Sequence, residues 1–361
     1  MADSDEYDTA TSGFDAFGQR LVVLIEDLLN AASISVNQVT YRVKKRKSAY
    51  DKVRDNPDKY SSVRDLTDLL GVRIITYFPD QVDAVAEIIT TEFNVEASRS
   101  TDKRAVLEAD QFGYLSVHYL ATLNKIRAAL TEYSQFAAIY IEFQIRSLLQ
   151  HTWAEIEHDL GYKSEVAVPR ELRRRFSRLA GLLEIADTEF QAIYDERADY
   201  TTRVSAQIQV GLGNLLLDQI SVVAYIEQNQ TVRDLDEKLA LILRSDLDPE
   251  DDVSVYYADD IARATLALGI GTIEELDELL RANIDLIVEF AKRWAEYGAG
   301  KGVPTPTEIP HGISLFYLAI VASIEIFDEN SEDLEDWTAS ELKLDRSVAY
   351  EFRETYRKAT E

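Results

Sequence analysis

Hydrophobic and polar residues alternate with two different periods in the first part of the chain. In residues 14–32, Leu21, Ile25, Leu28 and Leu29 recur at helical spacing with acidic residues between them, which predicts an amphipathic helix. From residue 33 to about 168, short β-branched runs are separated by helical stretches. The runs expected to form strands are VNQVTYRV, GVRIITYF, FNVEASR, SVHYLATL and IYIEFQIR, with a helix over residues 79–92. This pattern predicts an α+β fold, with helices flanking a mixed β-sheet.

The second part of the chain has only the helical period. A long helix is expected after Pro169, because proline is tolerated in the first turn of a helix. Further helices are expected at residues 232–244, 273–297 and 313–328. Residues 298–312, GAGKGVPTPTEIPHG, concentrate Gly and Pro and predict a linker or an exposed loop. We therefore expect two domains, residues 1–205 with the sheet and an all-α region over residues 206–361.

The amino-acid composition limits the class of protein that we expect and the cellular compartment in which we expect it. The chain has 361 residues, of which 46% are hydrophobic, so it is long enough to bury a sizeable core. It contains no cysteine, which excludes disulfides, thiolate metal sites and thiol nucleophiles. The N-terminus is acidic and polar and does not resemble a signal peptide, and the longest apolar run, residues 313–327, is too short for a membrane helix. We expect a cytoplasmic protein with no membrane partner.

The net charge of −27 is distributed unevenly. Residues 206–361 hold 13 of the 38 Lys and Arg residues and 32 of the 65 Asp and Glu residues, a net charge of −19, which leaves −8 for residues 1–205. Within the first part lie two basic clusters that could face a polyphosphate. They are Arg42, Lys44, Lys45, Arg46 and Lys47, and then Arg170, Arg173, Arg174, Arg175 and Arg178.

One expected strand, residues 138–146, has a polar face of unusual composition. Strict alternation places Ile141, Phe143 and Ile145 on one face and Glu142, Gln144 and Arg146 on the other. An acid, an amide and a cation in a row are costly to bury unless they line a binding site. A solvated edge strand is the simpler alternative.

Further polar residues occur in short motifs upstream. RVKKRKSAYDK supplies Arg42, Lys44, Ser48 and Lys52 where a strand ends and a helix begins, a place suited to phosphate binding. DLLGVR carries Asp68 and Arg73, and GYLSVH carries Tyr114 and His118. Each motif alone also fits a structural role, as a solvated charge run, a capping aspartate or a core tyrosine.

Taken together, these motifs resemble the synthetase domain of the RelA/SpoT family, including its stand-alone small alarmone synthetases. The resemblance covers residues 36–163 and rests on RVKKRKS, DLLGVR, GYLSVH, EFQIRS and HTWAEIEHDLGYK in the family's order. It implies a nucleotidyltransferase-like fold that transfers the β,γ-pyrophosphate of ATP to a ribose 3′-hydroxyl, with Mg²⁺ as cofactor and AMP as the second product. This is (p)ppGpp-type alarmone synthesis from GDP or GTP.

The resemblance also implies roles for individual residues. Arg42 and Arg73 would flank the adenine of ATP, and Lys44, Ser48 and Lys52 would bind its phosphates. Asp68 and Glu142 would hold magnesium and form the catalytic pair, with Glu142 also a candidate general base. Tyr114 would stack on the acceptor's base, and His118, Gln144 and Arg146 would orient the acceptor. The pair His158-Asp159 lies inside the synthetase motif HTWAEIEHDLGYK and does not indicate a hydrolase domain. In that helix Leu149, Trp153, Ile156 and Leu160 are expected to form the apolar seam, with His151 and His158 in packing roles.

The acceptor motif departs from the family's pattern. Synthetases that use guanosine nucleotides have Lys and Asn shortly before the tyrosine, whereas this chain has Asp110 and Phe112. Lys103, Arg104 or Arg127 could replace the lost cation. A toxic branch of the family instead pyrophosphorylates the 3′-end of tRNA, and some members have an inhibitory C-terminal domain.

The remaining expectations concern regulation and other classes of protein. Acidic stretches such as DLDPEDD at residues 246–252 and ENSEDLED at 329–336 could cover the basic clusters and inhibit the enzyme within the same chain. A catalytically inactive nucleic-acid-binding or regulatory protein is an alternative from another class, although five arginines on one helix more often form a solvated face or intramolecular ion pairs. A homo-oligomer is left open.

Overall fold

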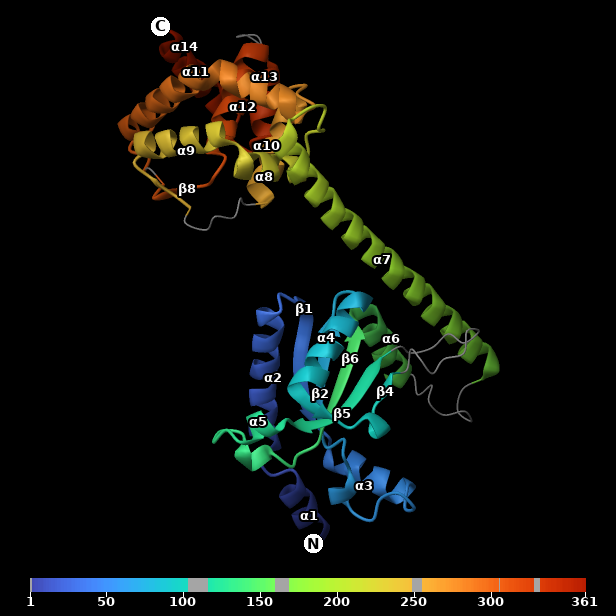
Figure 1. Cartoon of the computed structure of the whole chain (residues 1–361). Helices are drawn as coiled ribbons and strands as arrows, with labels where there is room; N and C mark the ends of the chain where they lie inside the picture. Colours follow the sequence, from blue (N-terminus) through green and yellow to red (C-terminus); the bar gives the residue numbers. More distant parts are fainter. Residues whose placement is uncertain (1, 103–115, 160–168, 249–254, 305, 328–331) are drawn as a thin grey trace. The chain divides into compact units, whose positions relative to one another are not determined.

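The structure is a computed structural model that describes residues 2–102, 116–159, 169–248, 255–304, 306–327 and 332–361 (Figure 1). The chain divides into two compact units, Met1–Asp195 and Glu196–Glu361. The boundary falls within the 41-residue helix α7 (Arg170–Val210). Each unit is described by itself.

The first unit is built on a mixed sheet of six strands. Their order is β1-β2-β6-β5-β3, and the short β4 pairs with β5. β2 and β6 run parallel, whereas the pairs β1–β2, β5–β6 and β3–β5 are antiparallel. The strands are β1 (Val36–Val43), β2 (Leu70–Thr76), β3 (Phe93–Val95), β4 (Thr101–Asp102), β5 (Val117–Leu123) and β6 (Ile141–Ser147). The expected α+β fold and its mixed sheet are confirmed.

One face of this sheet is the core of the unit. Alternate residues of β2 and β6, including Val72, Ile74 and Phe143, are fully buried there. The helices α2 (Phe14–Ala31) and α4 (Pro79–Glu92) contribute the opposing apolar residues, among them Leu21 and Val85 (Figure 1). Period-two strands and period-3.6 helices share one apolar layer, as their sequence patterns predict.

Shorter helical elements connect the strands or flank the sheet. They are α1 (Ala2–Ala10), α3 (Arg46–Asp55), η1 (Val63–Asp65), η2 (Ala97–Arg99), α5 (Lys125–Ala128), η3 (Ser134–Phe136) and α6 (Leu148–Asp159). Helix α6 contacts β2 and β6 and buries Trp153 against Phe176 of α7. The expected seam of α6 is wrong at Ile156, which is 48% exposed, because α7 packs against the side of α6 that carries Trp153 and Ala154.

The second unit is helical around a central apolar helix. Its elements are α8 (Gln219–Gln228), α9 (Gln230–Leu243), α10 (Val255–Ala267), α11 (Ile273–Gly300), α12 (Ile313–Ile326), α13 (Glu332–Ser340) and α14 (Ser347–Thr360). Helix α12 is apolar on nearly all sides because α9, α10, α11 and α14 surround it. Two strands of two residues each, β7 (Asp246–Leu247) and β8 (Glu308–Ile309), form a small parallel pair. The helical character expected of this region is confirmed with that addition. In the part of the chain that the structure describes, no helix is long and apolar enough to cross a membrane.

The Gly/Pro-rich residues 298–312 lie inside the second unit, where they form the last turn of α11 and the connection from α11 to α12. Gly312 precedes α12 with φ of +85°, and a Cβ atom there would lie 2.5 Å from Ile226 Cδ1, so both backbone and packing favour glycine. The buried carboxylate of Asp236 accepts hydrogen bonds from the backbone N–H groups of Gly312 and Ser314 at 2.7 and 2.9 Å. A side chain from α9 thus accepts hydrogen bonds from backbone N–H groups at the start of α12, which have no partner within that helix.

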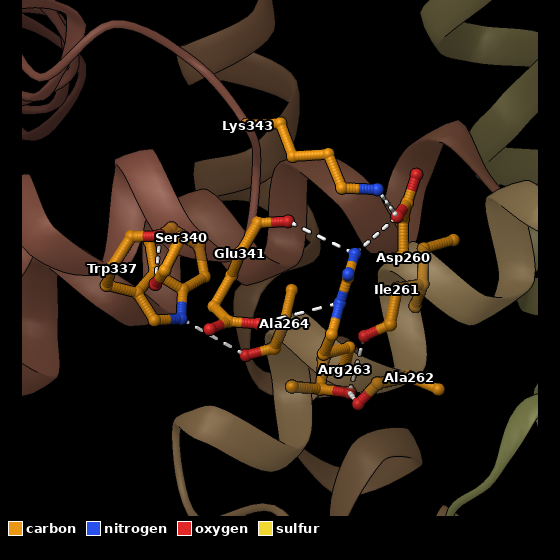
Figure 2. A network of polar contacts seen from close by, with 10 residues as sticks. Asp260, Ile261, Ala262, Arg263, Ala264, Trp337, Ser340, Glu341 and Lys343 are labelled. Carbon is orange, nitrogen blue, oxygen red and sulfur yellow. Dashed lines mark hydrogen bonds and ion pairs between the residues drawn. The ribbon is translucent and has the colours of Figure 1, made fainter.

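A polar network joins α10 to the segment between α13 and α14 (Figure 2). Arg263 pairs with Asp260 and with the carboxylate of Glu341, and Lys343 Nζ lies 3.1 Å from Asp260 Oδ1. The indole of Trp337 donates to the carbonyl of Ala264 at 3.2 Å. These contacts fix α13 on α10.

Candidate active site

The polar face of the sheet brings together most of the residues that the motifs single out. In the register of the sheet, Gly71 of β2 lies beside Glu142 of β6, and Arg73 lies beside Gln144. His118 of β5 lies on the other side of Gln144. The side chains of these positions alternate with core residues, so they share the face opposite to α2 and α4.

Asp68 holds two lysines at one edge of this face. Its Oδ2 accepts hydrogen bonds from Lys44 Nζ at 2.8 Å and from Lys52 Nζ at 2.6 Å. Lys44 directly follows β1, and its backbone N–H donates to the carbonyl of Leu69 at 2.8 Å, which draws the end of β1 to the start of β2. Lys52 reaches Asp68 from α3. The strand-to-helix turn therefore collects two cations around one carboxylate.

Asp68 is ionised in this environment. Burial raises the pKa of its carboxyl, but hydrogen bonds and positive charge from Lys44 and Lys52 outweigh burial, and the pKa lies below its ordinary value. Its second oxygen, Oδ1, is buried and accepts no hydrogen bond from any described residue. A buried carboxylate oxygen without a donor is a candidate ligand for a cation.

Glu142 begins a chain of polar contacts along β6. Gln144 Nε2 donates to Glu142 Oε2 at 2.9 Å, and Arg146 donates to Gln144 Oε1 at 2.8 Å. His118 Nδ1 lies 3.7 Å from Glu142 Oε1. Burial raises the pKa of Glu142, as does the charge of Asp68, but the His118 imidazole and the Gln144 amide outweigh them and the pKa is lowered. Glu142 is thus an ionised carboxylate, and it lies close enough to Asp68 for the charge of Asp68 to raise its pKa.

Arg73 and Arg42 lie on the same face. Arg73 pairs with Glu155 of α6 at 2.9 Å, and the aliphatic stem of Arg42 passes over Gly71, where a Cβ atom would lie 3.5 Å from Arg42 Cγ. Burial lowers the pKa of His151, and the positive charges of Arg146 and Arg73 lower it further, although Glu155 acts in the opposite direction. His151 and Glu155 were not predicted as site residues. In the sequence, their spacing of four residues on an expected helix indicates that the two side chains lie on the same face of the helix.

The other predicted residues either lie away from the Asp68 and Glu142 carboxylates or fall outside the residues that the structure describes. Ser48 is exposed on the first turn of α3, one turn before Lys52. Tyr114, with Lys103 and Arg104, lies outside the described residues. Arg127 pairs with Glu92, so its charge is already engaged within the fold.

The N-terminal helix α1 supports the basic segment. The hydroxyl of Tyr7 donates to the carbonyl of Lys44 at 2.5 Å. Arg46 pairs with Asp8 and lies over the ring of Tyr7, 5.0 Å from its centroid. No local sequence pattern predicts this contact, because Tyr7 and Lys44 are 37 residues apart and meet only through tertiary packing.

The donor set suits a divalent cation that also binds phosphates. Asp68 and Glu142 offer carboxylate oxygens, which magnesium prefers, and Mg²⁺ is commonly held by one or two carboxylates together with substrate phosphates. Among the residues that the structure describes, no group of three His, Asp or Glu side chains is arranged to hold a metal ion. The two carboxylates fit a cation that is also held by phosphates.

The first part of the chain is similar to known proteins. A model described as a region found in RelA / SpoT proteins matches residues 41–167. GTP pyrophosphokinase YjbM of Bacillus subtilis (strain 168) is 29% identical over 160 residues, which are 44% of this chain and 72% of that protein. The first unit thus contains, over residues 41–167, a region similar to the one found in RelA / SpoT proteins.

Two solved structures resemble the same half of the chain. Small alarmone synthetase 1 from Bacillus subtilis is 24% identical with a TM-score of 0.45, over 54% of this chain and 99% of that one. A GTP pyrophosphokinase family protein from Streptococcus pneumoniae is 25% identical with a TM-score of 0.44, over 54% of this chain and 96% of its own.

Proposed function

We propose that this protein is an ATP-dependent pyrophosphokinase that makes (p)ppGpp-type nucleotides from GDP or GTP. The observation that carries the proposal is the group of Lys44, Lys52, Asp68 and Glu142 on one face of a RelA/SpoT-family domain. The name of the relative YjbM, a GTP pyrophosphokinase, supports the choice of acceptor.

The chain's own residues account for phosphate binding. Each lysine ammonium has three N–H donors and uses one on Asp68, so donors remain for the phosphates of ATP. Arg73 and Arg42, on the same face, would flank the adenine. These cations would offset the negative charge that otherwise repels an attacking oxygen.

The proposed reaction forms one bond and breaks one. The 3′-oxygen of the acceptor ribose attacks the β-phosphorus of ATP, the bond from that phosphorus to the α,β-bridging oxygen breaks, and AMP leaves. Glu142, whose lowered pKa keeps it ionised, accepts the hydroxyl proton and passes it to solvent. A magnesium ion bound by Asp68 and Glu142 would supply charge stabilisation to the phosphates. Gln144 holds the Glu142 carboxylate, and Arg146 in turn holds Gln144.

The 3′-end of tRNA is a second candidate acceptor. Asp110 and Phe112 occupy the positions where guanosine-nucleotide synthetases have Lys and Asn, and Arg127 is already paired with Glu92. An acceptor whose 5′-phosphates need no local cation fits this change better.

The nature of the nucleotide product tests the reaction class. Purified protein with Mg-ATP and GDP, GTP or bulk tRNA should release AMP in an acceptor-dependent manner. Release of ADP would indicate transfer of a single phosphoryl group, and the absence of AMP with every acceptor would refute the proposal.

A further inference from the structure

Helix α6 brings an acidic side chain to one of the cations of the candidate site. The helix follows β6 directly, and its first turn is fixed by two hydrogen bonds. The Gln150 side chain accepts from the Ser147 N–H at 3.2 Å, and the Ser147 hydroxyl accepts from the Gln150 N–H at 3.3 Å. Two turns further on, Glu155 Oε1 lies 2.9 Å from Arg73 Nη1 on β2. The strand that carries Glu142 therefore also sets the position of Glu155.

The guanidinium of Arg73 depends on this one carboxylate. Among the residues that the structure describes, Glu155 is the acidic residue that pairs with Arg73. The Nε atom of Arg73 is buried and has no hydrogen-bond partner in the same part of the chain. An arginine side chain has many rotamers, and an ion pair restricts them. Without Glu155, no described acceptor would fix the orientation of this guanidinium.

Positive charge gathers near Glu155. Burial lowers the pKa of the His151 imidazole, and the charges of Arg146 and Arg73 lower it further, so both guanidinium groups lie near His151. His151 Nδ1 is 3.9 Å from Glu155 Oε1, but a neutral imidazole adds no charge to the ion pair. Like charges at short range repel each other. Glu155 therefore also offsets the repulsion between Arg73 and Arg146.

We propose that Glu155 is a positioning residue for the donor nucleotide, because it holds the guanidinium of Arg73 in the orientation that stacks on the adenine of ATP. The proposal rests on the proposed function, in which Arg73 flanks the adenine. A guanidinium stacks on an aromatic ring when the two planes are nearly parallel. A carboxylate bonded to the edge of the guanidinium limits rotation of that plane and leaves its faces free. Glu155 thus acts through Arg73 and need not touch ATP.

Stability does not explain this ion pair. The side chains of Arg73 and Glu155 are 25% and 51% exposed, and ion pairs with this exposure add little to folding, because water and salt screen them. The apolar contacts of Trp153 with Phe176 and Ala180 hold α6 in place independently of Glu155. Removal of the Glu155 charge should therefore leave the fold intact and change the behaviour of Arg73.

Binding of a non-reacting ATP analogue tests the proposal without an acceptor. The probe is ATP with a methylene group in place of the α,β-bridging oxygen, titrated with Mg²⁺ in a calorimeter. Glu155→Gln should raise its Kd about fivefold or more, because Arg73 no longer stacks in a fixed orientation. Asp159→Asn, which removes a charge from an exposed position of the same helix, is the matched control and should keep the parent Kd. Thermal unfolding should show both variants to be folded. An unchanged Kd in folded Glu155→Gln would overturn the proposal.

Inorganic triphosphate separates positioning from a general effect of charge. Loss of a negative charge should on its own strengthen the binding of a polyanion, so weaker binding of the ATP analogue is the opposite of the general effect. Triphosphate has no base to stack, and Glu155→Gln should bind it at least as tightly as the parent does. If triphosphate binding weakens as much as binding of the analogue, Glu155 does not act on the base, and the proposal is wrong.

A double-mutant cycle tests whether Glu155 acts through Arg73. Arg73→Ala should raise the Kd of the analogue, and Glu155→Gln should cause no further rise in that background. Additive effects would contradict the proposal. In turnover with GDP, Glu155→Gln should raise KM for ATP and leave kcat nearly unchanged. A parent that binds the analogue but releases no AMP with any acceptor would refute the proposed function, and the Kd comparisons would still decide the role of Glu155.

Discussion

Within the described part of the chain, only one of the two carboxylate oxygens of Asp68 accepts hydrogen bonds. Two lysines bond Oδ2, while Oδ1 is buried and accepts no hydrogen bond within the described part of the chain. Desolvating a carboxylate is costly, and one satisfied oxygen compensates for only part of that cost. The other oxygen is therefore a candidate ligand for the magnesium ion that we propose, and Glu142 is the second carboxylate near it.

Substitution of either carboxylate should remove activity without unfolding the protein. Asp68→Asn and Glu142→Gln keep the shape of each side chain but remove the charge, so we expect each to lower the rate of transfer by about a hundredfold or more. Glu87→Gln, on the exposed side of α4, is the matched control and should retain the parent rate. Rates within about tenfold of the parent for both variants, in proteins that remain folded at the assay temperature, would refute this assignment of the site.

The lowered pKa of Asp68 predicts a dependence of stability on pH. A carboxyl whose pKa is lower in the folded state than in the unfolded state stabilises the fold above its unfolded pKa, about 3.9, and this stabilisation is lost as pH falls through the folded pKa. Asp68→Asn lacks this contribution, so its free energy of unfolding should fall less than that of the parent between pH 6 and pH 3. Equal losses, measured by urea unfolding at each pH, would show that the lysines do not lower the pKa of Asp68.

Tyr114 provides a test of the acceptor site from the sequence alone. If its ring stacks on the acceptor's base, Tyr114→Phe should keep most of the activity, and Tyr114→Ala should lose about 1–3 kcal/mol of acceptor binding, typical of base stacking. Initial rates over a range of acceptor concentrations measure this difference. An equal loss in the two variants would assign the role to the hydroxyl.

At the scale of elements, the local sequence pattern predicts where strands and helices lie far better than it predicts which elements pack against one another. Val36–Val43 and Pro79–Glu92 have the expected bounds because each has a clear period and a proline or polar residue at its end. The alternation of residues 138–146 likewise places Glu142, Gln144 and Arg146 on one face, and the structure confirms it.

Contacts between distant elements could not be predicted in this way. Glu155 meets Arg73 because α6 lies against β2, and Tyr7 meets Lys44 because α1 packs near the end of β1. Neither pairing leaves a local pattern in the sequence. The two-residue pair β7–β8 is also too short for any periodicity to indicate.

Helix α1 should therefore influence ATP binding through Lys44. Tyr7→Phe removes only the hydroxyl that bonds the Lys44 carbonyl, at a cost of about 1 kcal/mol for a hydrogen bond of this kind. We expect KM for ATP to rise about fivefold with little change in kcat. Tyr356→Phe, which removes a hydroxyl bonded to Glu325 in the second unit, is the control. An unchanged KM would show that α1 does not position Lys44.

At the scale of the whole molecule, the chain has two separate cores and an uneven charge. The apolar core of the sheet and the core around α12 share no residue, and residues 206–361 carry −19 of the net charge of −27. If the first unit binds ATP as we propose, an acidic unit on the same chain would be suited to compete with the phosphates of ATP. Acidity that merely keeps a helical unit soluble is the alternative.

Removal of the second unit distinguishes these roles. If the acidic unit inhibits, a chain ending at Thr202 should be more active than the full chain, and adding the separate C-terminal fragment should restore inhibition. Circular dichroism and thermal unfolding must show that the shortened chain is folded. Unchanged activity in a folded shortened chain would exclude inhibition by the second unit.

The transfer of label from [γ-³²P]ATP tests the central claim most directly. The full chain is incubated with Mg²⁺, the labelled ATP and, separately, GDP, GTP or tRNA, with Glu142→Gln in parallel. We expect label on a guanosine nucleotide, as a pyrophosphate on its 3′-oxygen, together with an equal amount of AMP, and we expect neither product from Glu142→Gln. Label confined to tRNA would retain the reaction and replace the acceptor. No labelled acceptor of any kind from a folded protein, or equal labelling by Glu142→Gln, would contradict the account.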